Sequence, residues 1–144
     1  MGQVSASSSI TVAVSPQEAL AAIGDYETVR PKILSENYSG YRVVEGGVGT
    51  GTVVEWALKA TEKRTRNVRA KITATDSSVI ETDENSSMVT TWTAEPAAGG
   101  TKVTTTTTWN GAGGIGGFFE KTFAPIGLRK IQDQVLANLA RELG

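Results

Sequence analysis

The 144-residue chain contains no cysteine and no histidine. The absence of cysteine excludes disulfides, thiolate catalysis and cysteine-based metal sites, and it is consistent with a reducing compartment. The absence of histidine removes the commonest general base near neutral pH and the commonest metal ligand. We therefore expect a protein that uses neither a metal ion nor an organic cofactor.

An excess of charge of one sign is also lacking, because 14 lysines and arginines face 15 aspartates and glutamates. Without a basic surplus, binding to nucleic acid is not expected. No apolar stretch approaches the roughly 18 residues of a membrane span, and the first nine residues lack the basic and apolar regions of a signal peptide. These features predict a cytoplasmic protein with no stable membrane insertion. The length suits one domain over residues 1–144.

Small and apolar residues alternate with polar ones over residues 4–14, which predicts a strand with one buried face. Residues 15–18 read Ser-Pro-Gln-Glu, the pattern of a capping box with proline at the first helical position. This pattern predicts a short helix that ends at Gly24. A second short helix is expected at residues 26–30, with Pro31 limiting its length.

The same alternation recurs through the middle of the chain and predicts six more strands. Because the turns between them, at Pro96–Gly100 for example, are too short for crossover helices, the strands should pair antiparallel. The predicted strands are residues 38–45, 52–60, 65–75, 79–83, 88–94 and 102–109. Every second residue of a strand points to the same side of the sheet, and this parity predicts which residues face inward. They are Val54, Trp56, Leu58, Ala60, Val68, Ala70, Ile72, Ala74, Val103, Thr105, Thr107 and Trp109.

The last part of the chain predicts a long helix that packs on the sheet. Pro125 and Gly127 should cause a kink or a restart in it. Beyond them, apolar residues follow at steps of three and four. These are Leu128, Ile131, Val135 and Leu139, with Leu136 and Leu143 widening the stripe. A helix that lies over a strongly curved sheet leaves a cavity between the two, and this cavity is where we expect the functional site.

Five short segments carry a resemblance to a known group of proteins. They are the opening strand into residues 15–18, Asp-Tyr at 25–26 before 30–31, Gly-Thr-Gly-Thr at 49–52, Gly-Gly-Phe-Phe at 116–119 and Val-Leu-Ala-Asn-Leu at 135–139. With the order of elements, they make the whole chain resemble the SRPBCC superfamily, also described as START-like or Bet v 1-like. Within it, the chain is similar to the polyketide cyclase/dehydrase and lipid-transport family, and in particular to small actinobacterial, mycobacterial-like members without an assigned reaction.

The resemblance implies an α+β helix-grip fold. In this fold a seven-stranded curved antiparallel sheet wraps around a long C-terminal helix, and two short helices lie between the first and second strands. Because the superfamily includes binders, carriers and enzymes, the function has to be argued from the site.

Residues 111–116 match the dinucleotide-binding pattern G-x-G-x-x-G between a strand and a helix. That pattern also needs a later parallel strand with an acidic residue for the ribose, which this sequence does not offer. We interpret Gly111–Gly117 as a hinge that lets the helix and the neighbouring Phe118-Phe119 pair move and open the cavity.

Aromatic and aliphatic side chains dominate pockets for apolar ligands. The residues that we predict to line the cavity are Trp56, Leu58, Val68, Ile72, Met88, Trp92, Trp109, Phe119, Phe123, Ile131, Val135 and Leu139. Thr105 and Thr107 would add hydroxyls to its floor. The alternative for the tryptophans is that they belong to a filled core, and for the threonines that they reflect strand propensity alone.

Arg66 is the predicted polar anchor, since it shares parity with Val68 and Ile72. A guanidinium at one end of the cavity could bind a carboxylate or a phosphate headgroup. If the strand starts later, Arg64 and Arg66 are both solvated instead.

Other titratable residues are not expected to form a site. Glu81 and Asp83 lie two residues apart on one face, as paired carboxylates with split acid and base roles do. We expect that face to be polar and exposed to solvent, and by parity Glu55 should also lie outside. The three tyrosines are too weakly acidic to act unaided near neutral pH.

The function predicted from the sequence is the binding or transport of a small hydrophobic ligand, such as a lipid, a polyketide or an isoprenoid. Two alternatives stay open. One is a polyketide cyclase or dehydratase that folds a reactive chain in the same cavity, which the missing histidine disfavours but does not exclude. The other is an interaction module whose pocket is filled by its own side chains. The sequence identifies neither the ligand nor any catalytic residue or protein partner.

Overall fold

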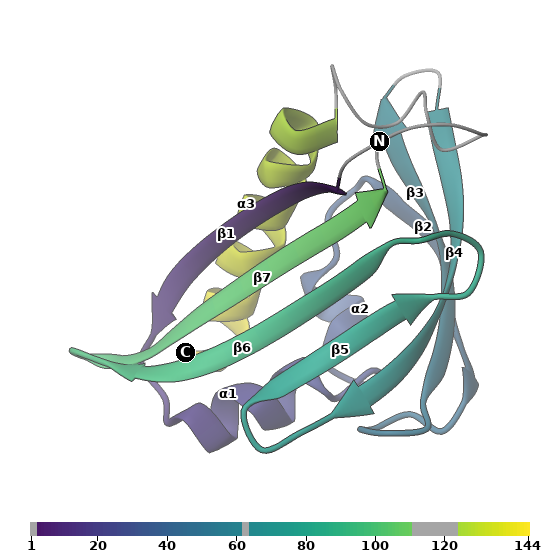
Figure 1. Cartoon of the computed structure of the whole chain (residues 1–144). Coiled ribbons are helices and arrows are strands. Elements are labelled where there is room, and N and C mark those ends of the chain that lie inside the picture. The colour runs from purple at the N-terminus through teal and green to yellow at the C-terminus, as the bar shows by residue number, and fades with distance from the viewer. Residues whose placement is uncertain (1–2, 62–63, 111–123) are drawn as a thin grey trace.

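The computed structural model describes residues 3–61, 64–110 and 124–144. Seven strands and three helices are found among them (Figure 1). Their bounds are β1 Gln3–Val12, α1 Pro16–Ile23, α2 Arg30–Ile33, β2 Tyr38–Glu45, β3 Val53–Thr61, β4 Arg64–Ala74, β5 Ser78–Asp83, β6 Val89–Ala97, β7 Gly100–Asn110 and α3 Ala124–Leu143.

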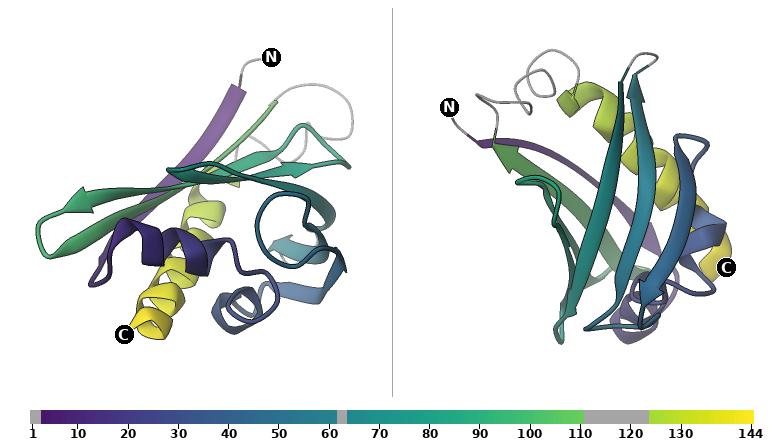
Figure 2. Two further views of the ribbon diagram at one scale, coloured as in Figure 1. Left: turned by 90° about the horizontal axis from the view of Figure 1, so that it is seen from below. Right: turned by 90° about the vertical axis from the view of Figure 1, so that its right-hand side faces the viewer.

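The strands form one antiparallel sheet in the order β1-β7-β6-β5-β4-β3-β2. The sheet curves, and α3 crosses its inner side while α1 and α2 close one end (Figures 1 and 2). This is the helix-grip fold that the sequence predicts. In the part of the chain that the structure describes, no helix is long and apolar enough to span a membrane.

The first short helix forms as predicted. The side chain of Ser15 accepts a hydrogen bond from the backbone N–H of Glu18 at 3.1 Å, and the Glu18 carboxylate accepts one from the Ser15 N–H at 3.2 Å. The second helix differs, because α2 covers residues 30–33 instead of 26–30. Pro31 lies in its first turn, where a missing N–H costs no helical hydrogen bond. Proline therefore belongs to the beginning of this helix, and residues 26–29 before it form a turn.

The buried faces of the strands follow the predicted parity, for example from Thr101 to Trp109 along β7. One predicted inward residue, Ala74, is instead exposed where β4 ends. The predicted turn at Pro96–Gly100 is also shorter than expected, because Pro96 pairs with Thr101 inside the β6–β7 ladder. At Pro96, β6 extends beyond the end of β5 and has no strand on that side. The missing N–H of proline therefore costs no hydrogen bond to β5.

The hairpin between β6 and β7 turns through Gly99 and Gly100, which have positive φ values of 85° and 146°. A Cβ atom on Gly100 would lie 2.0 Å from the carbonyl oxygen of Val12, whereas one on Gly99 would meet no atom within 4 Å. The close approach at Gly100 lets the hairpin pack directly against the end of β1.

Within the described residues, α3 runs from Ala124 without a break through Gly127. Of the predicted kink or restart at Pro125 and Gly127, the kink is therefore wrong for the described residues, where Pro125 lies in the first turn. A restart would involve the residues before Ala124, which lie outside the described part. The apolar stripe is confirmed. Its buried members are Leu128, Ile131, Val135, Leu136 and Leu139. The predicted hinge at Gly111–Gly117, like Phe118, Phe119 and Phe123, lies outside the described residues.

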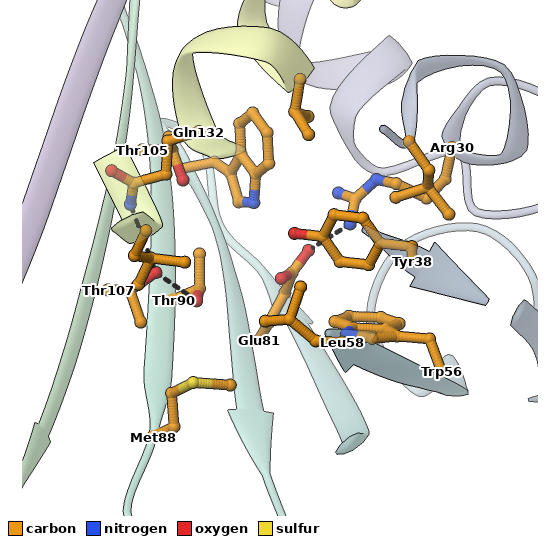
Figure 3. Close-up of a pocket in the computed structure, with 14 residues that line it drawn as sticks. Arg30, Tyr38, Trp56, Leu58, Glu81, Met88, Thr90, Thr105, Thr107 and Gln132 are labelled. Atoms are coloured by element: carbon orange, nitrogen blue, oxygen red, sulfur yellow. Dashed lines mark hydrogen bonds and ion pairs between the residues drawn. The ribbon is translucent and has the colours of Figure 1, made fainter. Parts of the chain in front are cut away.

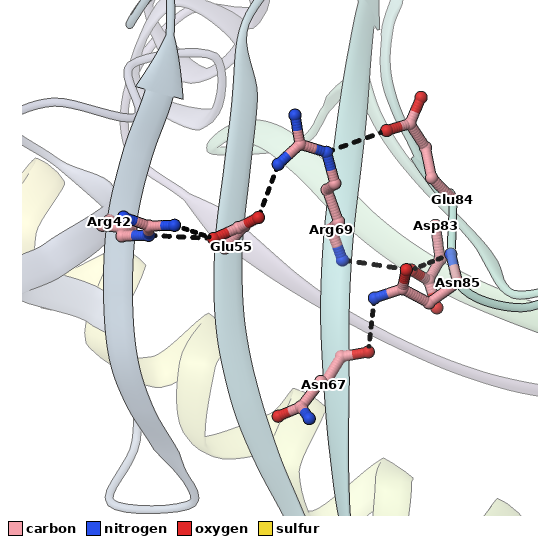
Figure 4. A network of polar contacts seen from close by, with 7 residues as sticks. All are labelled: Arg42, Glu55, Asn67, Arg69, Asp83, Glu84 and Asn85. Carbon is pink, nitrogen blue, oxygen red and sulfur yellow. Dashed lines mark hydrogen bonds and ion pairs between the residues drawn. The ribbon is translucent and has the colours of Figure 1, made fainter.

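A chain of ion pairs crosses the outer face of the sheet (Figure 4). The Glu55 carboxylate lies 2.6 Å from the guanidinium of Arg42 and 2.5 Å from that of Arg69, which also lies 3.1 Å from Glu84. Glu55 is thus on the outer face, as its parity predicts. The edge strand β2 is irregular, since its pairing with β3 shifts register on both sides of Arg42 and Val43.

Candidate functional site: a cavity between the sheet and helix α3

A cavity lies between the inner face of the sheet and α3 (Figure 3). Measured as the space open to the centre of a water molecule, its volume is about 40 Å³. That is room for roughly three water molecules. Its wall consists of Arg30, Leu34, Tyr38, Trp56, Leu58, Glu81, Met88, Thr90, Trp92, Thr105, Thr107, Leu128, Gln132 and Val135.

A buried ion pair forms one side of this wall. Arg30, the first residue of α2, places its Nη1 atom 2.7 Å from Oε2 of Glu81 on β5. The same oxygen accepts a hydrogen bond of 2.6 Å from the hydroxyl of Tyr26. Arg30 and Glu81 are only 3% and 6% exposed. Buried charges are tolerated only when paired in this way, so the two residues have to be considered as one neutral unit.

Aromatic rings flank the guanidinium of Arg30 and hold it in place. Its central carbon lies 4.4 Å from the ring centroid of Tyr26 and 5.1 Å from that of Trp92. Cation–π contacts of this kind strengthen when water is excluded. The second guanidinium nitrogen, Nη2, also donates to the carbonyl oxygen of Ile23 at 3.3 Å. Together these contacts fix the planes of Arg30 and Trp92 relative to the cavity.

Burial and the charges of the ion pair shift the pKa values of the ionisable groups in this region. Burial raises the pKa of Tyr26 well above its ordinary value of 10.0, and the neighbouring Glu81 carboxylate raises this pKa further. Burial and the same carboxylate also raise the pKa of Tyr38. For Arg30, burial disfavours the charged guanidinium, but Glu81 opposes this effect and raises the pKa above its ordinary value. Around neutral pH both phenols are therefore protonated and Arg30 is charged.

The opposite side of the cavity is polar but uncharged. Figure 3 shows Thr90, Thr105, Thr107 and Gln132 there, facing Arg30 and Tyr38 across the open space. The hydroxyl oxygens of Thr90 and Thr107 lie 2.7 Å apart. The side-chain N–H of Gln132 donates to the carbonyl oxygen of Ala6 at 3.1 Å, which anchors the middle of α3 to β1.

Several polar atoms of the wall have no hydrogen-bond partner among the residues that the structure describes. They are Nε of Arg30, Nε1 of Trp56, Nε1 of Trp92 and Oε1 of Gln132. Such groups are rare in folded proteins, because an unmet buried donor or acceptor costs about 1–3 kcal/mol. All four belong to residues of one wall, so water or a ligand in the cavity would be the partner available to them.

The structure brings together five of the predicted lining residues. These are Trp56, Leu58, Met88, Trp92 and Val135, and the two predicted threonines, Thr105 and Thr107, join them in the wall. Five others are buried but belong to the surrounding core rather than to this wall. They are Val68, Ile72, Trp109, Ile131 and Leu139.

The predicted anchor, Arg66, lies on β4 directly opposite Leu58, so it shares the inner side of the sheet. The strand begins at Arg64, early enough for the inward orientation that the sequence suggested. Arg66 is half-buried and is not part of the wall of this cavity. The arginine in the wall is Arg30, which the sequence pattern did not single out.

The expectation that Glu81 and Asp83 face solvent is wrong, because both are buried. In β5 they share parity with Val79, and it is this face that points inward. Glu81 enters the cavity wall. Asp83 instead shapes the turn after β5, where it accepts a hydrogen bond from the backbone N–H of Asn85 (Figure 4). It also accepts one from the hydroxyl of Ser86.

A groove of about 650 Å³ lies on the surface next to the cavity. It runs between α3 and the connection from α2 to β2. Its lining includes Ser35, Glu36, Asn37, Lys130 and Gln134. Leu34 belongs to the walls of both the groove and the inner cavity, so this side chain separates the two volumes.

Both a family model and a solved structure match nearly the whole chain. A family model described as "Polyketide cyclase / dehydrase and lipid transport" matches residues 3–144. The solution structure of the KanY protein is similar with a TM-score of 0.90, 57% sequence identity and 99% of each chain covered. No curated protein matches the chain significantly.

More distant structures share the fold alone. Ara h 8.0201 is 19% identical, with a TM-score of 0.65 and coverage of 99% of this chain and 98% of that one. Major latex-like protein 151 from Panax ginseng is 15% identical, with a TM-score of 0.70 and 97% of each chain covered.

Proposed function

Since the chain belongs to the polyketide cyclase/dehydrase and lipid transport family, we propose that it binds a small hydrophobic ligand between the sheet and α3. The ligand class is a lipid, a polyketide or an isoprenoid. The observation that carries the proposal is the wall itself. Apolar and aromatic side chains surround a few buried polar atoms without partners, which is the usual composition of a small-molecule site.

Binding requires the cavity to expand, because about 40 Å³ holds only water. The half-buried Leu34 lines both the cavity and the 650 Å³ groove. Displacing this side chain joins the two volumes and makes room for a molecule with ten or more heavy atoms. Ligand contacts are then proposed for the predicted residues Trp56, Leu58, Met88, Trp92 and Val135.

The proposal is tested by extracting lipids from the purified protein for mass spectrometry and by thermal unfolding with a panel of fatty acids, aromatic polyketides, quinones and isoprenoids. A ligand at a hundredfold excess over its Kd should add about 2.7 kcal/mol to the free energy of unfolding. Val135→Trp fills the space under α3 and should abolish the shift. Ile126→Trp, at an exposed position of the same helix, is the matched control.

Absence of a shift with every compound would contradict ligand binding. It would instead favour the interaction-module alternative, which the small cavity volume also fits. Of the large hydrophobic side chains described by the structure, only Val44, Val48 and Ile126 are exposed; the first two belong to β2 and the connection after it, and the third to α3. There is thus no contiguous apolar patch among them that identifies a docking surface.

A second candidate is a cyclase- or dehydratase-type enzyme, favoured by the Glu81 carboxylate in the cavity wall. With histidine absent, this carboxylate and the nearby phenol of Tyr38 are the groups that could move a proton. Glu81→Gln and Tyr38→Phe should then abolish turnover of a poly-β-ketone substrate while the fold is retained. Tyr41→Phe is the control, since the Tyr41 hydroxyl is bonded to the carbonyl oxygen of Tyr26 outside the wall.

A further inference from the structure

We infer that the cavity selects a neutral ligand that carries a hydroxyl group and rejects carboxylate ligands. This inference rests on the proposed ligand binding and adds the chemical class of the polar group. It differs from the expectation for Arg66, which pointed to a carboxylate or phosphate headgroup.

The charge of the wall is zero. Arg30 and Glu81 are the only charged side chains among its described residues, and they neutralise each other at 2.7 Å. The guanidinium is further occupied by the carbonyl oxygen of Ile23. A carboxylate entering this space would lose its water, find no uncompensated cation in the wall and face the Glu81 carboxylate. A neutral group carries no such cost.

The unmet atoms include both hydrogen-bond donors and an acceptor. The indole N–H of Trp92 and the Nε–H of Arg30 are donors, and both residues are more than nine-tenths buried. The acceptor is Oε1 of Gln132, which is 6% exposed. The orientation of this amide is fixed, because its nitrogen has to face the carbonyl oxygen of Ala6. The oxygen of Gln132 therefore cannot exchange places with a donor.

A hydroxyl is the smallest neutral group that accepts one hydrogen bond and donates another. Because both residues belong to the wall, the proposed contacts are one hydrogen bond accepted from Trp92 and one donated to Gln132. A carbonyl oxygen would accept from Trp92 but leave the oxygen of Gln132 without a donor. A hydrocarbon would provide a partner for neither residue. A site built with buried polar groups discriminates strongly against ligands that leave those groups unpaired.

The test compares three ligands with the same ring system, namely naphthalene, 2-naphthol and 2-naphthoate, by equilibrium dialysis against the full chain at neutral pH. We expect 2-naphthol to bind at least tenfold more tightly than either of the others. Trp92→Phe, which keeps a ring but removes the N–H, and Gln132→Leu should each reduce this preference at least several-fold. Trp109→Phe and Gln17→Leu make the same chemical changes outside the wall and should leave the preference unchanged.

A further variant tests whether the neutral charge of the wall excludes carboxylates. Glu81→Gln leaves Arg30 without its counter-charge, so 2-naphthoate should gain affinity relative to 2-naphthol, with retention of the fold checked by circular dichroism. If the wild-type protein binds 2-naphthoate or naphthalene as tightly as 2-naphthol, the inference is overturned while ligand binding stands. If none of the three binds but a compound of the thermal-unfolding panel does, this inference fails and ligand binding stands. If no compound of either set binds, the proposed function fails as well.

Discussion

Oε2 of Glu81 lies 2.7 Å from Nη1 of Arg30, although the two residues are 51 positions apart in the chain. The contact joins α2 to β5 across the closed end of the curved sheet. It determines the charge of the cavity and also contributes to holding the short helix, which has only four residues. Substitutions at this pair should therefore affect stability as well as binding.

Replacing Glu81 with leucine should lower the free energy of unfolding by about 3–5 kcal/mol, because the guanidinium of Arg30 stays buried without a partner. Adding Arg30→Met to this variant should restore most of the loss, since an apolar pair of similar size has no charge to desolvate. Urea unfolding of the two single variants and the double variant measures this. A double variant as unstable as the sum of the singles would contradict the interpretation. Glu55→Gln on the outer face, where the side chain is partly exposed, is the control and should change stability less.

The three tyrosines should resist ionisation in the folded protein. Burial comes first among the causes that raise the pKa of Tyr26, Tyr38 and Tyr41 above the ordinary value of 10.0. Because the folded state favours the neutral phenols, their stabilising contribution is complete below pH 10 and is lost as the pH rises beyond it towards the folded-state pKa values. Tyrosinate absorbance near 295 nm should stay low above pH 10 until the protein unfolds. A titration of the native protein centred on pH 10 would disprove this expectation.

Gly100→Ala should destabilise the protein more than Gly99→Ala. At Gly99 the cost is the positive φ alone, about 1–2 kcal/mol for a residue with a Cβ. At Gly100 the new Cβ would also lie 2.0 Å from the carbonyl oxygen of Val12, which is backbone and cannot move away freely. Thermal unfolding of the two variants gives the comparison. Equal losses would mean that β1 shifts to accommodate the methyl group.

Leu34→Ala should speed both the association and the dissociation of 2-naphthol, because it removes the side chain between the groove and the cavity. The ratio of the two rate constants should change less than either one. Stopped-flow quenching of tryptophan fluorescence reports on this, since Trp56 and Trp92 are in the wall. Leu20→Ala, at a half-buried leucine of α1 outside both walls, is the control. Rate constants that change equally in the two variants would place the entrance elsewhere.

Much of the fold could be predicted because its signals are local. Alternating residues defined the strands, the Ser15–Glu18 capping box defined α1, and steps of three and four defined the buried stripe of α3. One error involves proline, which can either end a helix or occupy its first turn. The sequence predicts that Pro31 limits a helix over residues 26–30, but Pro31 lies in the first turn of α2, where the missing N–H has no cost.

The polar part of the site was harder to predict, because it depends on contacts between distant segments. Glu81 shares parity with Val79, and that signal could have shown its inward orientation. Nothing near Arg30 in the sequence indicates that its partner lies on β5. Gln132 likewise interrupts an apolar stripe, and its role becomes clear only when Ala6 of β1 is seen beside it.

The irregular pairing of β2 has a consequence for how molecules of this protein meet one another. As one rim of an open sheet, β2 offers backbone groups to which a strand from a second molecule could hydrogen-bond. The register shifts around Arg42 and Val43, together with the left-handed backbone of Gly40, break the even spacing that such a strand would need. A charged arginine stands at the same place. The rim is thereby protected from edge-to-edge aggregation, even though the sheet never closes into a barrel.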